Sequence, residues 1–170
     1  EQNKTRGGVR FVEGMKATVR DAAGSTVGVQ IIFWDVTESR KAELALRNSQ
    51  MRYRTLYDSS RDAIMVLKPG GKFLSGNPAA VELFGCADEA EFTSCGPGDL
   101  SPEFQPDGRS SEVLAQEMMA LAMERGSNFF DWKHRRIDGS EFFATVLLTR
   151  MELEGESLLQ ATVRDVTDQK

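Results

Sequence analysis

Histidine and cysteine supply many of the nucleophilic, basic and metal-binding side chains of enzymes, and this chain contains few of either. Its 170 residues include one histidine, His134, and two cysteines, Cys86 and Cys95. Serines are frequent, but a catalytic serine needs a neighbouring base, and His134 lies in the string WKHRR within a strand pattern. For the same reason His134 is not a phosphoacceptor on a helix. The sequence therefore predicts no catalytic residue.

Metal and phosphate sites are also poorly supported. Eight residues separate Cys86 from Cys95, so there is no CxxC spacing, and a single histidine cannot complete a metal cluster. Two free thiols suit a reducing cytoplasm. The glycine-rich strings PGGK (69–72) and CGPGD (95–99) lack the spacing of a phosphate-binding loop, so we expect turns there.

The composition is that of a folded, acidic protein. Hydrophobic residues make up 40% of the chain and charged residues 28%, with a net charge of -5 and a pI near 5.0. DNA or RNA is not an expected partner, because an acidic chain gains little from counterion release. No apolar run approaches the ~20 residues of a membrane span, and the initial EQNKTRGG lacks the core of a signal peptide. We expect a cytoplasmic location and no membrane contact by these residues, which leaves open an anchor elsewhere in the parent protein.

The most informative feature is a repeat of the tripeptide DVT, at 35–37 and again at 165–167. Each copy follows two β-like runs around a glycine-containing turn, and each precedes the start of a helix. The second copy is preceded by about a hundred further residues, whereas the first begins almost at the chain start. We therefore predict that residues 1–36 are the C-terminal strands of a preceding domain and that residues 58–170 form a complete domain of the same kind.

The repeated tripeptide also suggests a joint between strand and helix. Its aspartate ends a strand, and its threonine lies where the threonine side chain can cap the following helix. The aspartate can pair with a basic residue one turn later, such as Arg40 or Lys170. The candidate junction residues are Asp35, Thr37, Arg40, Asp165 and Thr167.

Residues 37–57 contain no glycine or proline and are rich in helix formers, so they predict a single linker helix. One face of this helix carries a stripe with a spacing of four and three residues, at Ala42, Leu46, Ser49, Tyr53 and Leu56, and the polar Ser49 interrupts it. This thin stripe fits either a dimeric coiled coil or a helix that packs on its neighbouring domain.

The remaining residues predict an α+β domain with five antiparallel strands. Strands are expected at 62–68, 72–76, 128–136, 140–153 and 156–166, with the turn Asp138-Gly139 supplying tight hairpin geometry. Helices are expected at 77–85, closed by Gly85, and at 112–126, closed by Gly126. Residues 93–111 contain three of the five prolines and predict an irregular, lid-like loop.

In this order, several strings resemble the PAS family of sensory domains. They are YRTLYDSSRDAIMVL (53–67), GNPAAVELFG (76–85), HRRIDGSEF (134–142) and VRDVTD (163–168), while residues 9–41 resemble the last strands of the same fold. The resemblance implies a sheet with strand order 2-1-5-4-3 that encloses a cavity against its helices. It also implies a place upstream of an effector, such as a histidine kinase of a two-component system or a cyclic-dinucleotide enzyme.

Strand alternation places several apolar side chains on the face that would line such a cavity, and the long helix adds methionine and leucine. The cavity candidates are Asn77, Phe84, Met118, Leu121, Phe130, Trp132, His134, Phe142, Ala144, Val146, Leu159 and Ala161. The same side chains could instead fill a plain core. His134 could be a hydrogen-bonded structural residue, or a sensor of protons or anions.

Cofactor signatures known in the family are absent from the sequence. Light-oxygen-voltage members carry a reactive cysteine in an NCRFLQ-like string, and haem-binding members a histidine on the long helix; neither feature occurs here. A non-covalent ligand, such as a flavin or an organic acid, stays open, because it needs only a cavity and a few polar groups.

The resemblance implies a sensory module that binds a small ligand or a partner and relays a conformational change through the two aspartate-x-threonine junctions. The alternative is a ligand-free association module that sets the geometry of the effector. An N-terminal hairpin with an uncovered apolar face favours a homodimer through the hairpin and the linker helix.

Overall fold

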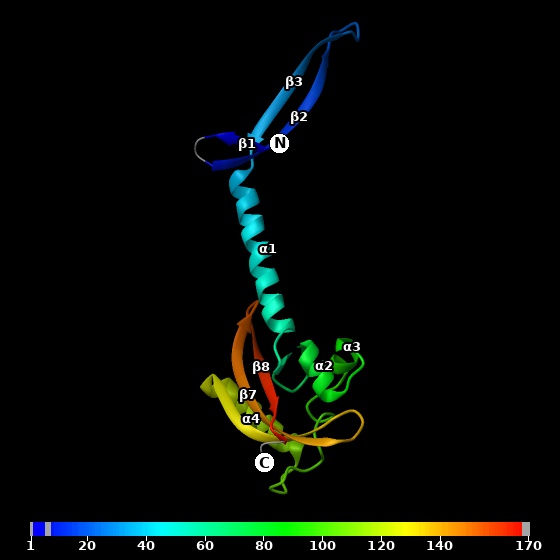
Figure 1. The fold of residues 1–170 in the computed structure, drawn as a ribbon, viewed down its shortest axis with the longest axis vertical. Helices are drawn as coiled ribbons and strands as arrows, with labels where there is room; N and C mark the ends of the chain where they lie inside the picture. Colours follow the sequence, from blue (N-terminus) through cyan, green and yellow to red (C-terminus); the bar gives the residue numbers. More distant parts are fainter. Residues whose placement is uncertain (1, 6–7, 168–170) are drawn as a thin grey trace. The chain divides into compact units, whose positions relative to one another are not determined.

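The computed structural model describes residues 2–5 and 8–167, which form two compact units, 1–54 and 55–170. The first unit contains strands β1 (Gln2–Thr5), β2 (Gly8–Arg20) and β3 (Thr26–Asp35), paired antiparallel in the order β1-β2-β3 (Figure 1). Alternate residues of β3 project four apolar side chains from the same face, and all four are exposed. They are Val27, Val29, Ile31 and Phe33.

Helix α1 (Thr37–Asp58) runs for 22 residues without interruption, as its composition predicts. The apolar side chains of its predicted stripe are exposed in the single chain, including Leu46, Tyr53 and Leu56. The exposed stripe can therefore pack against a second helix.

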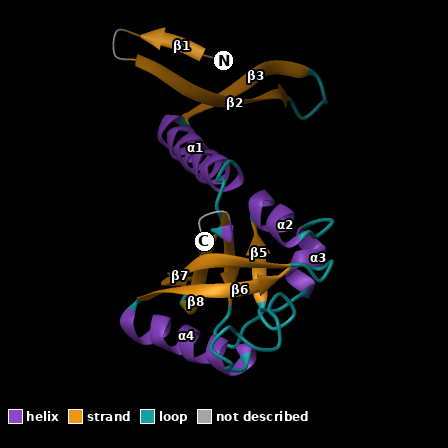
Figure 2. Ribbon diagram, turned by 60° about the horizontal axis from the view of Figure 1, so that its bottom comes forward, coloured by secondary structure: helices purple, strands orange, loops and turns teal. Residues whose placement is uncertain are grey.

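The second unit is built on a five-stranded antiparallel sheet, which confirms the predicted α+β class. Its strands are β4 (Ala63–Leu67), β5 (Phe73–Gly76), β6 (Ser127–Arg135), β7 (Glu141–Leu153) and β8 (Glu156–Asp165). They lie in the order β5-β4-β8-β7-β6, which is 2-1-5-4-3 when β4 is counted as the first strand. The first strand therefore pairs with the last, so β8 lies at the centre of the sheet. Figure 2 labels β5, β6, β7 and β8 of this sheet.

Three helices accompany the sheet: α2 (Pro78–Phe84), α3 (Glu89–Ser94) and α4 (Ser111–Arg125). Gly85 and Gly126 end α2 and α4 in the left-handed conformation, as predicted, because glycine lacks the Cβ that disfavours it. Helix α3 was not predicted. Its N-cap, Asp88, accepts a hydrogen bond from the Glu91 backbone N–H at 2.8 Å, and its Phe92 is fully buried.

The core lies between one face of the sheet and these helices. Strand β7 alternates as expected, burying Phe142, Ala144, Val146 and Leu148 on that face. Burying a large apolar side chain contributes roughly 1.5–3 kcal/mol, so this face carries much of the domain's stability. No helix among the described residues is both long enough and apolar enough to cross a membrane.

Candidate functional site: an internal cavity and two strand-helix junctions

A cavity of about 60 Å³ lies within the second unit. Its wall combines all five strands of the sheet with α2, α4 and the loop at 97–101. The accessible wall is almost wholly apolar, and no lining residue is an aspartate, glutamate, lysine or arginine. No group of three or more histidine, cysteine, aspartate or glutamate side chains suitable for a metal ion occurs in the described part of the chain.

The cavity brings together half of the side chains that the sequence analysis proposed for it. These six are Phe84, Phe130, Trp132, His134, Val146 and Ala161. The wall also contains residues that the sequence analysis missed. Met65 and Leu67 could have been found, because they lie two residues apart in the predicted strand 62–68 and so share one face of it. Leu100 and Ser101 carry no such signal, because they lie in an irregular loop.

The other six proposed residues do not line the cavity. Phe142, Ala144 and Leu159 are buried elsewhere in the core. On α4 the choice of Met118 and Leu121 was wrong for this cavity, because the helix turns Ala115 and Met119 toward it instead. A one-residue error matters in a helix, since each residue rotates the side-chain direction by about 100°.

Asn77, the last of the six, is a structural residue. Its Oδ1 accepts hydrogen bonds from the backbone N–H of Ile64 at 2.9 Å and of Ala80 at 3.0 Å. Its Nδ2 donates to the carbonyl oxygens of Tyr57 and Asp62, both at 3.1 Å. All four hydrogen-bonding positions of this fully buried amide are therefore committed to backbone groups, and none is available to a ligand.

Of the polar side chains that line the cavity, the imidazole of His134 is the one best suited to bind a ligand. Its Nδ1 lies 3.2 Å from the carbonyl oxygen of Leu100, which can only accept, so Nδ1 carries the proton. Nε2 is closed to solvent and has no hydrogen-bond partner, although the residue as a whole is half-buried. Its ring packs against Phe84, edge-on with centroids 5.2 Å apart, and stacks on Phe142 at 5.3 Å. Burial lowers the pKa of His134 to about 4, so the ring is neutral at neutral pH.

The loop beside the cavity is fixed to strand β6 by buried side chains. The amide of Gln105 accepts from the Lys133 backbone N–H at 2.9 Å and donates to the Lys133 carbonyl at 3.1 Å and to Ser111 Oγ at 2.8 Å. Trp132 Nε1 donates to Ser101 Oγ at 3.0 Å. Gln105 thus satisfies backbone groups of β6 at the edge of the sheet, which holds the cavity wall in place.

Cys86 does not resemble a reactive thiol. Cys86 and Cys95 are both free and half-buried. Burial raises the pKa of Cys86 to about 11, assisted by Cys95, Glu91 and Asp88, so its thiolate is scarce at neutral pH.

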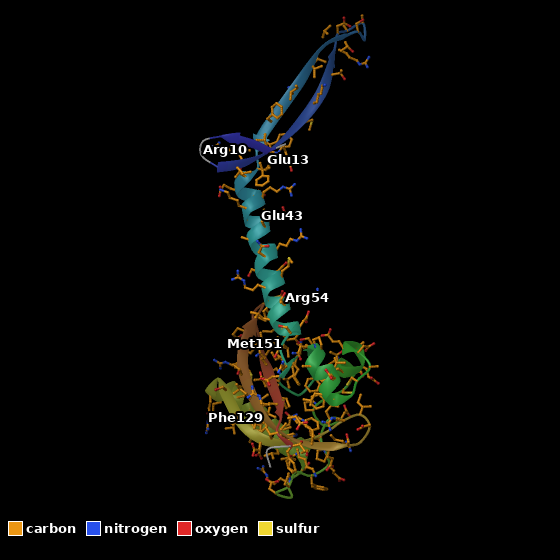
Figure 3. All side chains as sticks on the ribbon, in the orientation of Figure 1. Arg10, Glu13, Glu43, Arg54, Phe129 and Met151 are labelled. Atoms are coloured by element: carbon orange, nitrogen blue, oxygen red, sulfur yellow. The ribbon has the colours of Figure 1, made fainter. Side chains whose placement is uncertain are left out.

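The first junction joins β3 to α1. Asp35 Oδ1 accepts a hydrogen bond from the Thr37 backbone N–H at 2.9 Å, and Asp35 Oδ2 pairs with Arg10 at 3.4 Å (Arg10 is labelled in Figure 3). Thr37 Oγ1 accepts from the Phe11 backbone N–H on β2 at 2.9 Å. The Phe11 carbonyl in turn accepts from the Val36 N–H at 2.9 Å. The threonine hydroxyl therefore ties the helix start to the neighbouring strand. It does not cap α1 as predicted, because its hydrogen-bond partners are the backbone groups of Phe11.

The second junction repeats this pattern at the end of β8. Asp165 Oδ1 accepts from the backbone N–H of Thr167 at 2.9 Å and from its hydroxyl at 2.6 Å. Thr167 Oγ1 accepts from the Phe143 N–H on β7 at 3.3 Å, and the Phe143 carbonyl accepts from the Val166 N–H at 2.9 Å. Arg136 pairs with Asp165 Oδ2 at 3.1 Å. Both aspartates therefore hold the turn that follows their strand.

The predicted partner of the first aspartate was wrong. Arg40 does not pair with Asp35; it bonds Glu43 on α1 at 3.2 Å and Glu13 on β2 at 3.4 Å. The expectation followed sequence spacing, whereas strand pairing brings a different arginine to the aspartate. Lys170, proposed for the second aspartate, lies outside the described residues.

Replacing Thr167 with valine should raise the pKa of the Asp165 carboxyl. Burial raises this pKa, but hydrogen bonds from Thr167 and the ion pair with Arg136 outweigh burial and lower it. Valine keeps the backbone donor and removes the hydroxyl, and should also cost about 1 kcal/mol of stability. Carboxyl carbon NMR across an acid titration measures the pKa, with Thr162→Val on the same strand as control. An unchanged Asp165 titration would contradict this assignment.

Comparison with known proteins agrees with this geometry. Residues 51–119 match the family model of the PAS domain. The PAS domain of an HTR-like protein from Haloarcula marismortui is 27% identical, with a TM-score of 0.61 over 75% of this chain and 99% of that one. The sensor protein FixL of Bradyrhizobium diazoefficiens is 26% identical over 159 residues, and sporulation kinase E of Bacillus subtilis is 34% identical over 53 residues.

The second unit of this chain therefore has the fold of a PAS domain, and residues 51–119 carry the match to the PAS family model. The match to FixL covers 94% of this chain but 31% of FixL, and the match to sporulation kinase E covers 31% of this chain and 7% of that kinase. The chain thus corresponds to a fraction of the length of the proteins it resembles.

Proposed function

We propose that residues 55–170 sense a small, neutral, largely apolar molecule that occupies the cavity. The observation that carries this proposal is the cavity itself, whose wall is apolar inside a domain of a sensory family. A single water molecule needs roughly 10–15 Å³ of such space. A cavity of about 60 Å³ therefore accommodates a compact molecule of a few non-hydrogen atoms. An apolar cavity of this kind stays dry and gains free energy when an apolar ligand fills it.

The charge of the wall favours a neutral ligand over an organic acid. The lining contains no lysine or arginine, and His134 is neutral at neutral pH. A carboxylate placed there would lose its hydration without gaining a cation, which costs several kcal/mol. A related fold, the PAS domain of a LuxR-family regulator from Burkholderia thailandensis, was solved in complex with ethanol, a neutral molecule of this size class.

The relay that we propose runs along β8. Ala161 and Val163 on this strand line the cavity, and Asp165 and Thr167 follow them at the second junction. A ligand that binds two arrangements of the sheet unequally shifts their populations, by no more than its difference in affinity. The hydrogen bonds of the junction would pass that shift to the helix that follows. Valine at Thr37 or Thr167 should weaken this coupling in the intact parent protein.

For the first unit we propose a second domain of the same kind, of which residues 1–36 are the last strands. Val12 pairs with Asp35, as Ala144 pairs with Asp165, so the two repeated aspartates occupy the same register of their hairpins. The two junctions also share their hydrogen bonds to a phenylalanine backbone. The α1 helix would then be a linker between two sensory domains.

We further propose that the parent is a cytoplasmic sensor, or a sensor with a cytoplasmic signalling region, that controls a histidine kinase. Two curated relatives, FixL and sporulation kinase E, support this class of effector. A cyclic-dinucleotide enzyme is the alternative effector.

The test is ligand-observed NMR with isobutanol and isobutyrate, which share a carbon skeleton and differ in charge. We expect isobutanol to show saturation transfer at neutral pH and isobutyrate to show none, because the wall offers no cation. Native mass spectrometry and an absorption spectrum of the same sample report any ligand retained from expression. Failure of both probes, together with a mass free of ligand, would overturn the sensing proposal.

A second candidate function is a ligand-free association module. The observation that favours it is the exposed apolar face of β3, where Ile31 and Phe33 are each more than half exposed. Such a face, together with the stripe on α1, would join two copies of the chain. A concentration-dependent dimer without ligand, abolished by Phe33→Glu, would favour this function.

A further inference from the structure

Resting on the sensing function proposed above, we propose that the ligand enters through a surface pocket beside the start of α4 and that the Met119 side chain gates its entry. The surface pocket has a volume of about 450 Å³. It lies between the turn at Gly70 and Gly71, the loop at 96–98 and the first turns of α4.

Three residues line both spaces: Pro97, Ala115 and Met119. A residue that lines two neighbouring spaces forms the partition between them. The partition is therefore built from one loop proline and one face of α4, and it is a single layer of side chains thick.

Met119 is the movable part of this partition. Alanine has no side-chain torsion, and proline is held by its ring, whereas methionine has an unbranched chain with three rotatable bonds. A Cβ placed on Gly71 would lie 3.4 Å from Pro97 Cδ and 3.7 Å from Met119 Cε. The glycine, the proline and the methionine thus meet at the partition, where Met119 is 5% exposed.

Hydrogen bonds close the two turns that lie beside Met119. The Gly71 N–H donates to the Lys68 carbonyl at 2.9 Å, which closes the turn between β4 and β5. On the opposite side, the Gly96 N–H donates to Asp99 Oδ2 at 2.8 Å, and the Asp99 N–H donates to the Gly96 carbonyl at 3.0 Å. Because both turns are closed in this way, rotation of one side chain is a less costly opening than movement of the loop.

The experiment compares Met119→Ala with Met118→Ala by xenon NMR on the full chain. Xenon is a small apolar probe that enters dry cavities on the basis of size. Met118 is the adjacent methionine on the same helix and lines neither space, so it is the matched control. We expect Met119→Ala to speed both entry and exit of xenon by about tenfold or more, and Met118→Ala to leave both rates within about twofold.

A second arm leaves the partition intact and closes the outer pocket. In a Cys86→Ala/Cys95→Ala background, a bulky maleimide is attached at Glu112→Cys or at Val113→Cys. Both residues are exposed on α4, and only Glu112 of the two lines the surface pocket. The label at position 112 should slow xenon exchange, and the label at position 113 should not. This arm decides the question if Met119→Ala fails to fold.

The outcomes separate the gate from the sensing function. Xenon binding with equal rates in the two methionine variants, or with equal rates for the two labels, would overturn the entry route and leave the cavity function standing. Absence of xenon binding in the unmodified chain would overturn both, because there would be no cavity to load.

Discussion

Replacing Asn77 with alanine should lower the free energy of unfolding of the second unit by about 3–5 kcal/mol. The change removes all four hydrogen bonds of a fully buried amide, two to backbone N–H groups and two to backbone carbonyls. Each buried group left without a partner costs about 1–3 kcal/mol, and water has no access to replace the amide. The bonds join the end of α1, the start of β4 and the start of α2, so the loss should be felt across the domain.

Urea unfolding of the full chain measures this effect. A Trp34→Phe background leaves Trp132 as the fluorescent reporter of the second unit. The matched control is Asp88→Ala, which removes an exposed cap of α3 and should cost about 1 kcal/mol. Equal losses in the two variants would show that the buried amide does not organise the domain.

Acidification from pH 6.5 to pH 4 should destabilise the wild-type domain by about 3 kcal/mol through His134 alone. The pKa of this ring is about 4 in the folded domain, mainly because of burial, against an ordinary value of 6.5. The unfolded chain therefore takes up a proton in this range while the folded domain does not. The stability contributed by the neutral ring is complete above pH 6.5 and is lost as the pH falls toward 4.

The charged groups near His134 determine whether the pH dependence of stability reports on His134 alone. The charged neighbours are Asp165, which acts to raise the pKa of His134, and Arg136, whose guanidinium lies 4.2 Å above the Phe142 ring and pairs with Asp165. The pKa of the Asp165 carboxyl is lowered from 3.8, so its own protonation falls below the pH range in question.

His134→Phe should remove most of the pH dependence between 6.5 and 4. Phenylalanine keeps a planar ring among Phe84 and Phe142, and the Leu100 carbonyl retains its hydrogen bond from the Arg135 N–H at 3.0 Å. Urea unfolding at several pH values in this range measures the slope. A variant that loses stability as steeply as the wild type would show that another group titrates there.

Sequence patterns located the elements well, because those patterns are local. Gly85 and Gly126 end helices where they were expected to, and Ser140 closes the predicted Asp138 turn by a 2.8 Å bond to the aspartate. The repeated DVT was informative for the same reason. Each aspartate accepts a hydrogen bond from the backbone N–H of the threonine two residues later, which is a local contact. The bond from each threonine hydroxyl to a strand 24 or 26 residues away could not be read from the tripeptide.

Contacts between distant elements were harder to predict. Met118 and Met119 are indistinguishable by type, and only the rotation of α4 against the sheet decides which one reaches the cavity. Asn77 was proposed as a ligand group because its side chain is polar. Its four partners lie between 3 and 20 residues away, and its role appears only when the chain is folded.

The sequence by itself determined the α+β class, the strand and helix order, the helix-ending glycines and the two equivalent junctions. These follow from side-chain periodicity and backbone preferences, which act over a few residues. Only the tertiary structure decided which side chains enclose the cavity, which arginine pairs with each aspartate, and that Nε2 of His134 lies buried without a partner. Those features depend on long-range packing, in which the position of one side chain is set by residues far away in the chain.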